Sequence, residues 1–90
     1  MLFEWDEAKR QQNIEKHGID FYDVREIWLG DVLEYASRQS QHGEERYLAI
    51  GRLHGELVTV VFTWREGFRR LISARKARRY EQEDYASFYG

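Results

Sequence analysis

The sequence of 90 residues predicts an α+β fold, with an antiparallel β-sheet of about four to five strands, two N-terminal helices and one C-terminal helix. Two observations support this prediction. Apolar residues recur at helical spacing near the N-terminus, whereas between residues 32 and 76 they alternate with a period of two. Short turns then divide the alternating stretch into consecutive strands, which should pair antiparallel. We expect a single domain spanning residues 1–90, with the helices packed on one face of the sheet.

The first part of the chain shows clear helix signals. A short strand is expected at residues 3–5, and Asp6 suits the N-cap of a helix over residues 7–17. Gly18 suits the left-handed position that ends this helix. Asp20 is the N-cap candidate of a second helix, which buries one apolar face.

The second part of the chain is expected to form strands and a last helix. The predicted strands are residues 32–37, 46–53, 56–64 and 68–76. The strand at 56–64 is partly apolar on both sides and should therefore be central. His54-Gly55 forms a tight hairpin turn, residues 39–44 form a loop, and a helix over residues 77–88 ends the chain.

Several classes of protein are excluded by composition. No apolar run approaches 18 residues, so no membrane span is expected, and the first six residues lack the apolar segment of a signal peptide. The absence of cysteine excludes disulfides and thiolate metal ligands, which favours a reducing cytoplasm. The histidines are too far apart to suggest a metal site, and no cofactor is predicted. They are His17, His42 and His54.

The distribution of charge is more informative than the net charge of −2. Residues 65–79 contain seven basic residues and one acidic residue, a net charge of +6, whereas the other 75 residues carry −8. Six of the seven basic residues are arginines, whose guanidinium groups make bidentate contacts with phosphate. This asymmetry predicts one cationic surface that binds a polyanion, although an ordinary solvated face is the alternative.

Several motifs occur in order along nearly the whole chain. They are Phe3-Glu4-Trp5-Asp6, Ala8-Lys9, Asn13, Lys16-His17-Gly18, Phe21, Trp28, Gly43-Glu44-Glu45-Arg46, Gly51, and Ile72–Ala77 followed by Glu81 and Tyr85. Together they resemble the BrnT family, the ribonuclease toxins of type II toxin–antitoxin systems. The resemblance implies a RelE/ParE-like fold and metal-independent RNA cleavage that inhibits translation. It also implies neutralisation by a BrnA-type antitoxin, through which alone the protein would contact operator DNA.

The expected chemistry needs fixed cations. The 2′-hydroxyl of RNA attacks the adjacent phosphorus when its proton is removed and the charge that develops is stabilised. We predict that Arg75 clamps the scissile phosphate, with a salt bridge to Glu81 as an equally weighted alternative. Arg65 and Lys76 are further catalytic candidates, although strand alternation places Lys76 on the face opposite Arg75.

His17 is the candidate for general acid or base, because its pKa lies near neutrality. We favour the alternative that the C-terminus of the first helix stabilises a cationic His17. Lys9 and Asn13 lie one helical turn apart, so they and His17 are expected to form a polar ridge beside the sheet. Lys9 and Asn13 are accordingly RNA-binding candidates.

The remaining RNA-binding candidates lie near the basic segment. Trp64 offers a surface on which a base can stack, and Arg69 should share a face with Arg75, at a spacing that suits neighbouring phosphates. Other candidates for RNA contact are Arg70, Arg78, Arg79 and Tyr85. Arg78 and Arg79 would also suit an acidic antitoxin segment, and Tyr85 is more easily explained as a core aromatic. A non-catalytic RNA-binding module, or a protein-interaction domain using the same surface, is the alternative function.

Overall fold

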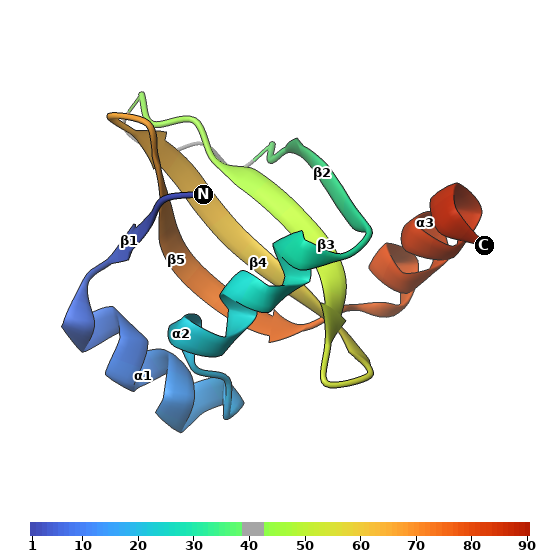
Figure 1. Ribbon diagram of the computed structural model, residues 1–90, viewed down its shortest axis with the longest axis horizontal. Helices are drawn as coiled ribbons and strands as arrows, with labels where there is room; N and C mark the ends of the chain where they lie inside the picture. Colours follow the sequence, from blue (N-terminus) through green and yellow to red (C-terminus); the bar gives the residue numbers. More distant parts are fainter. Residues whose placement is uncertain (39–42) are drawn as a thin grey trace.

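The computed structural model describes residues 1–38 and 43–90, which form an α+β fold around a five-stranded sheet (Figure 1). The strand order is β1-β5-β4-β3-β2. The strands are β1 (Phe3–Trp5), β2 (Val32–Ala36), β3 (Tyr47–Leu53), β4 (Glu56–Arg65) and β5 (Phe68–Lys76). The helices are α1 (Glu7–His17), α2 (Phe21–Val24), its 3-10 continuation η1 (Arg25–Leu29) and α3 (Arg79–Tyr89). The predicted fold class is confirmed, whereas His42 and most of the predicted loop lie outside the described residues.

The sheet is mixed rather than wholly antiparallel. β2, β3, β4 and β5 pair antiparallel in sequence order, but β1 pairs parallel to β5. The rule that short turns produce antiparallel pairs does not apply to β1, because the helices and three strands separate it from β5 in the chain. β4 is central, as its apolar composition predicted: it pairs with β3 over residues 56–62 and with β5 over residues 58–65.

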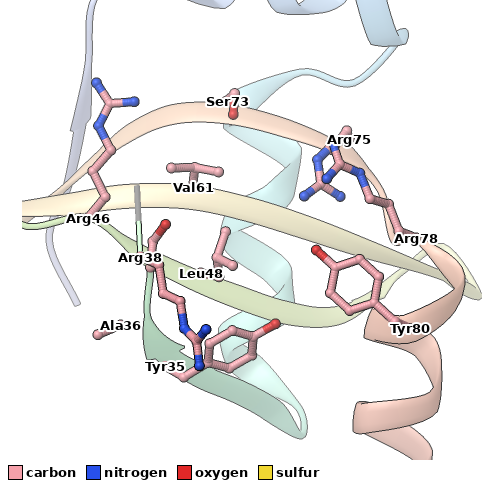
Figure 2. A pocket seen from close by; sticks show the side chains of 11 residues that line it. Tyr35, Ala36, Arg38, Arg46, Leu48, Val61, Ser73, Arg75, Arg78 and Tyr80 are labelled. Atoms are coloured by element: carbon pink, nitrogen blue, oxygen red, sulfur yellow. The ribbon is translucent and has the colours of Figure 1, made fainter. Parts of the chain in front are cut away.

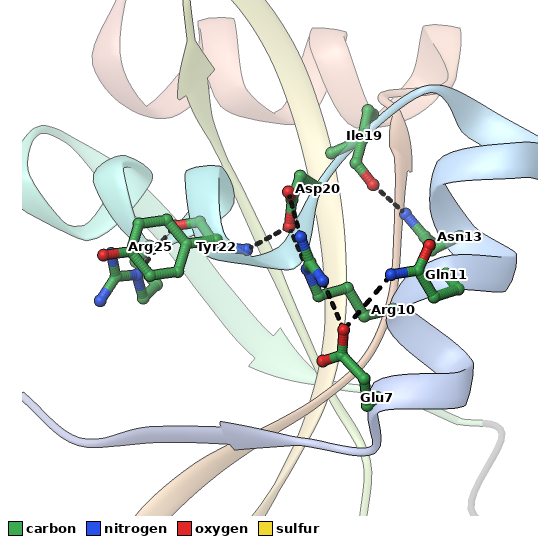
Figure 3. Close-up of polar contacts among 8 residues, drawn as sticks. All are labelled: Glu7, Arg10, Gln11, Asn13, Ile19, Asp20, Tyr22 and Arg25. Atoms are coloured by element: carbon green, nitrogen blue, oxygen red, sulfur yellow. Dashed lines mark hydrogen bonds and ion pairs between the residues drawn. The ribbon is translucent and has the colours of Figure 1, made fainter.

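The predicted caps of the N-terminal helices are confirmed. The Asp6 side chain accepts a hydrogen bond from the Lys9 backbone at 3.1 Å, and Gly18 adopts a φ of 70°. Asp20 accepts a hydrogen bond from the Tyr22 backbone at 2.9 Å and a bidentate contact from Arg10, at 2.7 and 2.9 Å (Figure 3). Arg10 therefore ties α1 to the start of α2.

The second helix tightens after one turn, which the sequence did not predict. Its buried residues Phe21, Val24 and Ile27 recur every three residues, the period of a 3-10 helix. Gly51 allows η1 to lie directly on β3, because a Cβ atom at that position would lie only 2.8 Å from the Cβ of Ile27.

The helices cover both faces of the sheet, so the prediction of one covered face is wrong. The main core lies between the sheet and α2 with η1, and it includes Phe21, Ile27, Val60 and Phe62. Ile50 points to the opposite face, where it belongs to a smaller cluster contributed by α3 and the segment before it. Figure 1 shows α3 apart from α1 and α2. Strand alternation makes this possible, since β3 is apolar on both sides.

A β-bulge interrupts β5. Val61 of β4 pairs with Ser73, but the next residue, Phe62, pairs with Leu71, so one residue of β5 is left over. An extra residue reverses the alternation of side chains beyond it. Arg69 therefore lies on the face of the main core and Arg75 on the opposite face, and the prediction that they share a face is wrong.

Candidate nucleic-acid interface

A concavity of about 640 Å³ opens on the face of the sheet that α3 partly covers (Figure 2). Segments from β2 to α3 contribute to it, although they are far apart in the sequence. The lining residues are Tyr35, Ala36, Ser37, Arg38, Arg46, Leu48, Val61, Ser73, Arg75, Arg78 and Tyr80. The sequence had singled out Arg75 and Arg78 but not the other arginines or the two tyrosines.

Two local features of the backbone assemble this lining. The Ser37 backbone donates to the Arg46 carbonyl oxygen at 2.7 Å, which extends the β2–β3 ladder and brings Arg38 and Arg46 to one rim. At the other end, the Ala77 backbone donates to Leu57 at 3.0 Å before the chain leaves the sheet for α3. The turn into α3 thus places Arg78 and Tyr80 beside the end of β5 (Figure 2).

The described lining of the concavity is strongly cationic. It contains four arginines and no aspartate, glutamate or histidine. Arg46 has a weak contact with Glu44 at 3.4 Å, whereas the guanidinium groups of Arg38 and Arg78 make no ion pair with any described residue. The concavity therefore keeps positive charge that is available to an anionic ligand.

Arg75 is fixed by a buried carboxylate at the base of α3. Its two terminal nitrogens donate to the two oxygens of Glu81 at 2.6 and 3.0 Å, and the Glu81 side chain is fully buried. One oxygen of Glu81 also accepts from the Thr59 hydroxyl at 3.0 Å and from the Arg78 backbone at 2.7 Å. The salt bridge that the sequence offered as an alternative is present, and Arg75 nevertheless lines the concavity.

The electrostatics of this pair favour its charged form. Burial alone would raise the pKa of Glu81, but the hydrogen bonds from Arg75 and from the Arg78 backbone hold it below its ordinary value. The position of Glu81 in the first turn of α3 adds the favourable interaction of an anion with a helix N-terminus. The same hydrogen bonds raise the pKa of Arg75, so the guanidinium stays cationic.

The two tyrosines of the lining face the arginines. Figure 2 shows the hydroxyl groups of Tyr35 and Tyr80 pointing into the concavity. Burial, followed by the negative charges of Glu81 and Asp84, raises the pKa of Tyr35, so its hydroxyl remains protonated at neutral pH. The spacing of residues in the sequence did not identify these tyrosines. The predicted pairing of the strands at 32–37 and 46–53 was the only feature that could have indicated the rim near Tyr35.

The predicted polar ridge on α1 does not reach the concavity. Asn13 is buried, its amide nitrogen donates to Ala74 at 3.0 Å and to Ile19 at 2.9 Å, and its oxygen accepts from the Ala74 backbone at 3.0 Å. Asn13 therefore joins α1 to β5, because its amide bonds both the N–H and the C=O of Ala74, as a neighbouring strand would. Lys9 is exposed on the same helix and does not line the concavity.

His17 lines a separate, smaller concavity of about 290 Å³ together with Lys76 and residues of the β3–β4 turn. Burial, with the charges of Lys16 and Arg75, lowers the pKa of His17. His17 lies in the last turn of α1, where it was predicted, and its lowered pKa favours the neutral imidazole. Lys76 lies on the face opposite Arg75, as predicted, within 3.8 Å of Glu56.

Arg69 is enclosed by aromatic rings on the face of the main core. Its guanidinium carbon lies 5.0 Å from the ring centre of Trp28 and 4.5 Å from that of Trp64, and it pairs with Glu34 at 3.0 Å. The side chain is only 12% exposed. Arg69 therefore stabilises the packing of η1 and β2, while Trp64 remains half-exposed.

The other predicted contacts are dispersed. Arg65 ends β4 on the same face as Arg75, but six residues along β4 separate it from the residue opposite Arg75, a distance of about 20 Å. Arg70 pairs with Glu4 of β1, and Arg79 is almost fully exposed with a contact to Glu83 at 3.5 Å. Tyr85 is buried and donates to the carbonyl oxygen of Asp31 at 3.1 Å, which confirms its interpretation as a core aromatic.

Among the described residues, no group of three or more histidine, cysteine, aspartate or glutamate side chains is placed to hold a metal ion. None of the helices in the described part of the chain has the length and apolar character needed to cross a membrane.

Fold and site together define a small α+β protein with a cationic concavity on one face of its sheet. The family model described as "Ribonuclease toxin, BrnT, of type II toxin-antitoxin system" matches residues 5–81, and the chain belongs to this family. The protein is thus a ribonuclease toxin whose system includes an antitoxin and whose target is RNA. No curated protein matches the chain closely enough to be compared with it.

Proposed function

We propose that the concavity cleaves RNA without a metal ion, by attack of the substrate's own 2′-hydroxyl on the adjacent phosphorus. The observation that carries this proposal is the fixed guanidinium of Arg75, held on the buried carboxylate of Glu81 in a concavity that Arg38 and Arg78, which make no ion pair with a described residue, also line. Such a preorganised cation stabilises the charge of the pentacovalent phosphorane and needs no reorganisation during the reaction.

The hydrogen-bonding capacity of Arg75 leaves room for a substrate. A guanidinium has five N–H donors, and Glu81 uses one from each terminal nitrogen. A second N–H of one terminal nitrogen contacts the Lys76 carbonyl oxygen at 3.4 Å. The Nε–H and one N–H of the other terminal nitrogen remain for a phosphate oxygen of the substrate. Arg38, Arg46 and Arg78 hold the neighbouring phosphates around the same concavity.

We assign proton transfer to the leaving group to Tyr35. Its hydroxyl group is protonated at neutral pH and points into the concavity, where it can donate to the leaving oxygen. In the proposed step the 2′-oxygen forms a bond to phosphorus and loses its proton to water. The bond from phosphorus to the 5′-oxygen breaks, and that oxygen takes the proton of Tyr35. The products are a 2′,3′-cyclic phosphate end and a 5′-hydroxyl end.

The biological part of the proposal follows from the family. Cleavage of cytoplasmic RNA inhibits translation, and a BrnA-type antitoxin neutralises the protein. The DNA-binding part of that antitoxin brings the complex to operator DNA, which the toxin itself does not contact. The exposed Arg79, outside the concavity, suits an acidic segment of the antitoxin.

Incubation of the purified protein with single-stranded RNA in EDTA tests the catalytic proposal. Fragments with cyclic or 3′-phosphate ends that form in the chelator support it. A shifted but intact RNA would instead indicate the non-catalytic binding module, and cleavage that returns only with added divalent metal would contradict metal independence.

The chain offers a matched pair of variants for this assay. Arg78→Ala and Arg79→Ala remove the same charge from adjacent exposed residues, but Arg78 alone lines the concavity. Arg78→Ala should raise the KM for RNA by about tenfold, since hydrogen bonds to charged groups contribute about 1.5–3 kcal/mol. Arg79→Ala should change it by less than about twofold, in line with the small contribution of exposed charges. Equal effects of the two variants would show that the concavity is not the site.

A further inference from the structure

Tyr80 differs from the other exposed aromatic residues of the described chain. Four of the five have a ring or cation partner: Tyr22 with Arg25 and Trp5, Trp64 with Arg69, and Phe88 and Tyr89 with each other. Tyr80 is 52% exposed and makes no ring contact and no hydrogen bond with any described residue. It lines the concavity, where its ring is presented to solvent beside Arg75 and Arg78 (Figure 2).

The backbone that carries the Tyr80 ring is anchored by the next residue in the chain. Glu81, the next residue, is fully buried and is bound by Arg75 and by Thr59. The ion pair between β5 and α3 thus anchors the first turn of α3, from which the Tyr80 ring projects, next to the Arg75 guanidinium. An aromatic ring and cations that border one cavity are the two elements of single-strand recognition, in which bases stack and phosphates are neutralised.

We propose that Tyr80 is the base-stacking residue of the concavity, so that the site takes single-stranded RNA with one unpaired base on the Tyr80 ring. This inference rests on the proposed function and names its substrate class. The phosphates that flank the stacked base contact Arg75 and Arg78, and Tyr35 lies across the concavity. A duplex does not fit this arrangement, because both faces of each base are already stacked within the helix.

A binding experiment with an uncleavable probe tests the assignment. The probe is a fluorescein-labelled RNA strand with a 2′-O-methyl group on every ribose, which removes the attacking hydroxyl, and its affinity is measured alone and in a duplex. Tyr80→Ala should weaken binding of the single strand by about fivefold or more, the usual contribution of one stacked base, and leave duplex binding unchanged. Tyr80→Phe should bind like the unmodified protein.

Two control variants separate stacking from other effects. Phe88→Ala removes a 69% exposed aromatic ring from the same helix outside the concavity, and it should leave both affinities unchanged. Arg78→Ala should reduce the slope of log affinity against log salt by about one, whereas Tyr80→Ala should not alter this slope. Circular dichroism of each variant verifies that α3 is intact.

The outcomes distinguish the inference from the function on which it rests. Unchanged single-strand affinity in Tyr80→Ala, or an equal loss for strand and duplex, overturns the stacking role. If the unmodified RNA is never cleaved but single-strand binding depends on Tyr80, the proposed catalysis fails and the stacking role stands. If Tyr80→Ala weakens only antitoxin binding, the exposed ring serves a protein partner and the inference is wrong.

Discussion

The two faces of the sheet use similar residues for different purposes. On the face of α2 and η1, Arg69 is enclosed by aromatic rings, and at the edge of β5 the buried Asn13 of α1 is bound to the backbone of Ala74. On the opposite face, α3 covers only one end of the sheet, and Arg75 borders an open concavity.

Enclosure, rather than residue type, therefore decides the role of a polar side chain in this protein. Arg69 and Arg75 belong to the same strand, and each pairs with a glutamate. Arg69 has rings on its other sides, whereas Arg75 has a cavity of nucleotide-scale volume. The β-bulge in β5 produces this separation, because it sends the two side chains to opposite faces.

Truncation of the main core should have the largest effect on stability. Phe62→Ala should lower the free energy of unfolding by about 3–5 kcal/mol, because Phe62 is buried among rings of the main core. Val61→Ala, one residue away but directed at the concavity, should lower it by less than about 2 kcal/mol. Urea denaturation measures both free energies of unfolding. Similar decreases for the two variants would mean that the two faces of the sheet are equally well packed.

Loss of the fixed cation should have the largest effect on catalysis. Arg75→Ala should reduce the cleavage rate by about a hundredfold or more, as for other fixed donors to a developing charge. It also leaves the Glu81 carboxylate buried without its cation. The double variant Arg75→Ala/Glu81→Gln should therefore recover stability, since it removes the buried charge, but not activity. Urea denaturation measures the stability of the double variant, and single-turnover cleavage measures its activity. Recovery of both would show that Arg75 has only a structural role.

Removal of the Asn13 side-chain amide should lower the stability of the protein without changing its affinity for RNA. Asn13→Ala leaves the buried N–H and C=O groups of Ala74 without the partners that the amide supplied, which should cost about 1–3 kcal/mol. Affinity for single-stranded RNA should not change in the folded protein. Weaker RNA binding with an unchanged free energy of unfolding would instead support the predicted role of Asn13 in RNA binding.

Acid should destabilise the protein in two stages. The pKa of His17 and that of Glu81 are both lowered on folding, so the unfolded state takes up protons first and stability falls as pH falls. The His17 contribution begins to disappear below its ordinary pKa of 6.5, and the Glu81 contribution below 4.5. His17→Gln should flatten the first stage, and Glu81→Gln the second, in unfolding measured against pH. If the loss of stability below pH 6.5 persists in His17→Gln, another titratable group causes it.

Removal of the Lys76 cation, on the face opposite the concavity, should have the smallest effect on the cleavage rate. Lys76 is next to Arg75 but lies on the opposite face with an exposed contact to Glu56. Lys76→Ala should change the cleavage rate by less than about twofold, because exposed pairs of this kind contribute little. A loss comparable to that of Arg75→Ala would indicate that RNA reaches both sides of β5.

The sequence alone determined the fold class, the helix caps and the hairpin turns, because these depend on neighbouring residues. Asp6, Gly18 and the two-residue turn at His54 act through the local backbone. It also indicated that Arg75 and Glu81 belong together, since six residues and one turn separate them. The alternation in β3 carried a signal for apolar contacts on both sides, although it did not reveal which helix would supply them.

Only the tertiary structure decided which cations face the site. One extra residue in β5 reversed the side of Arg69, and the β2–β3 hairpin brought in Arg38 and Arg46. Register and burial depend on contacts between distant segments, so strand periodicity could not supply them. The cationic surface is therefore a property of the assembled sheet, whereas the elements that build it are properties of short stretches of sequence.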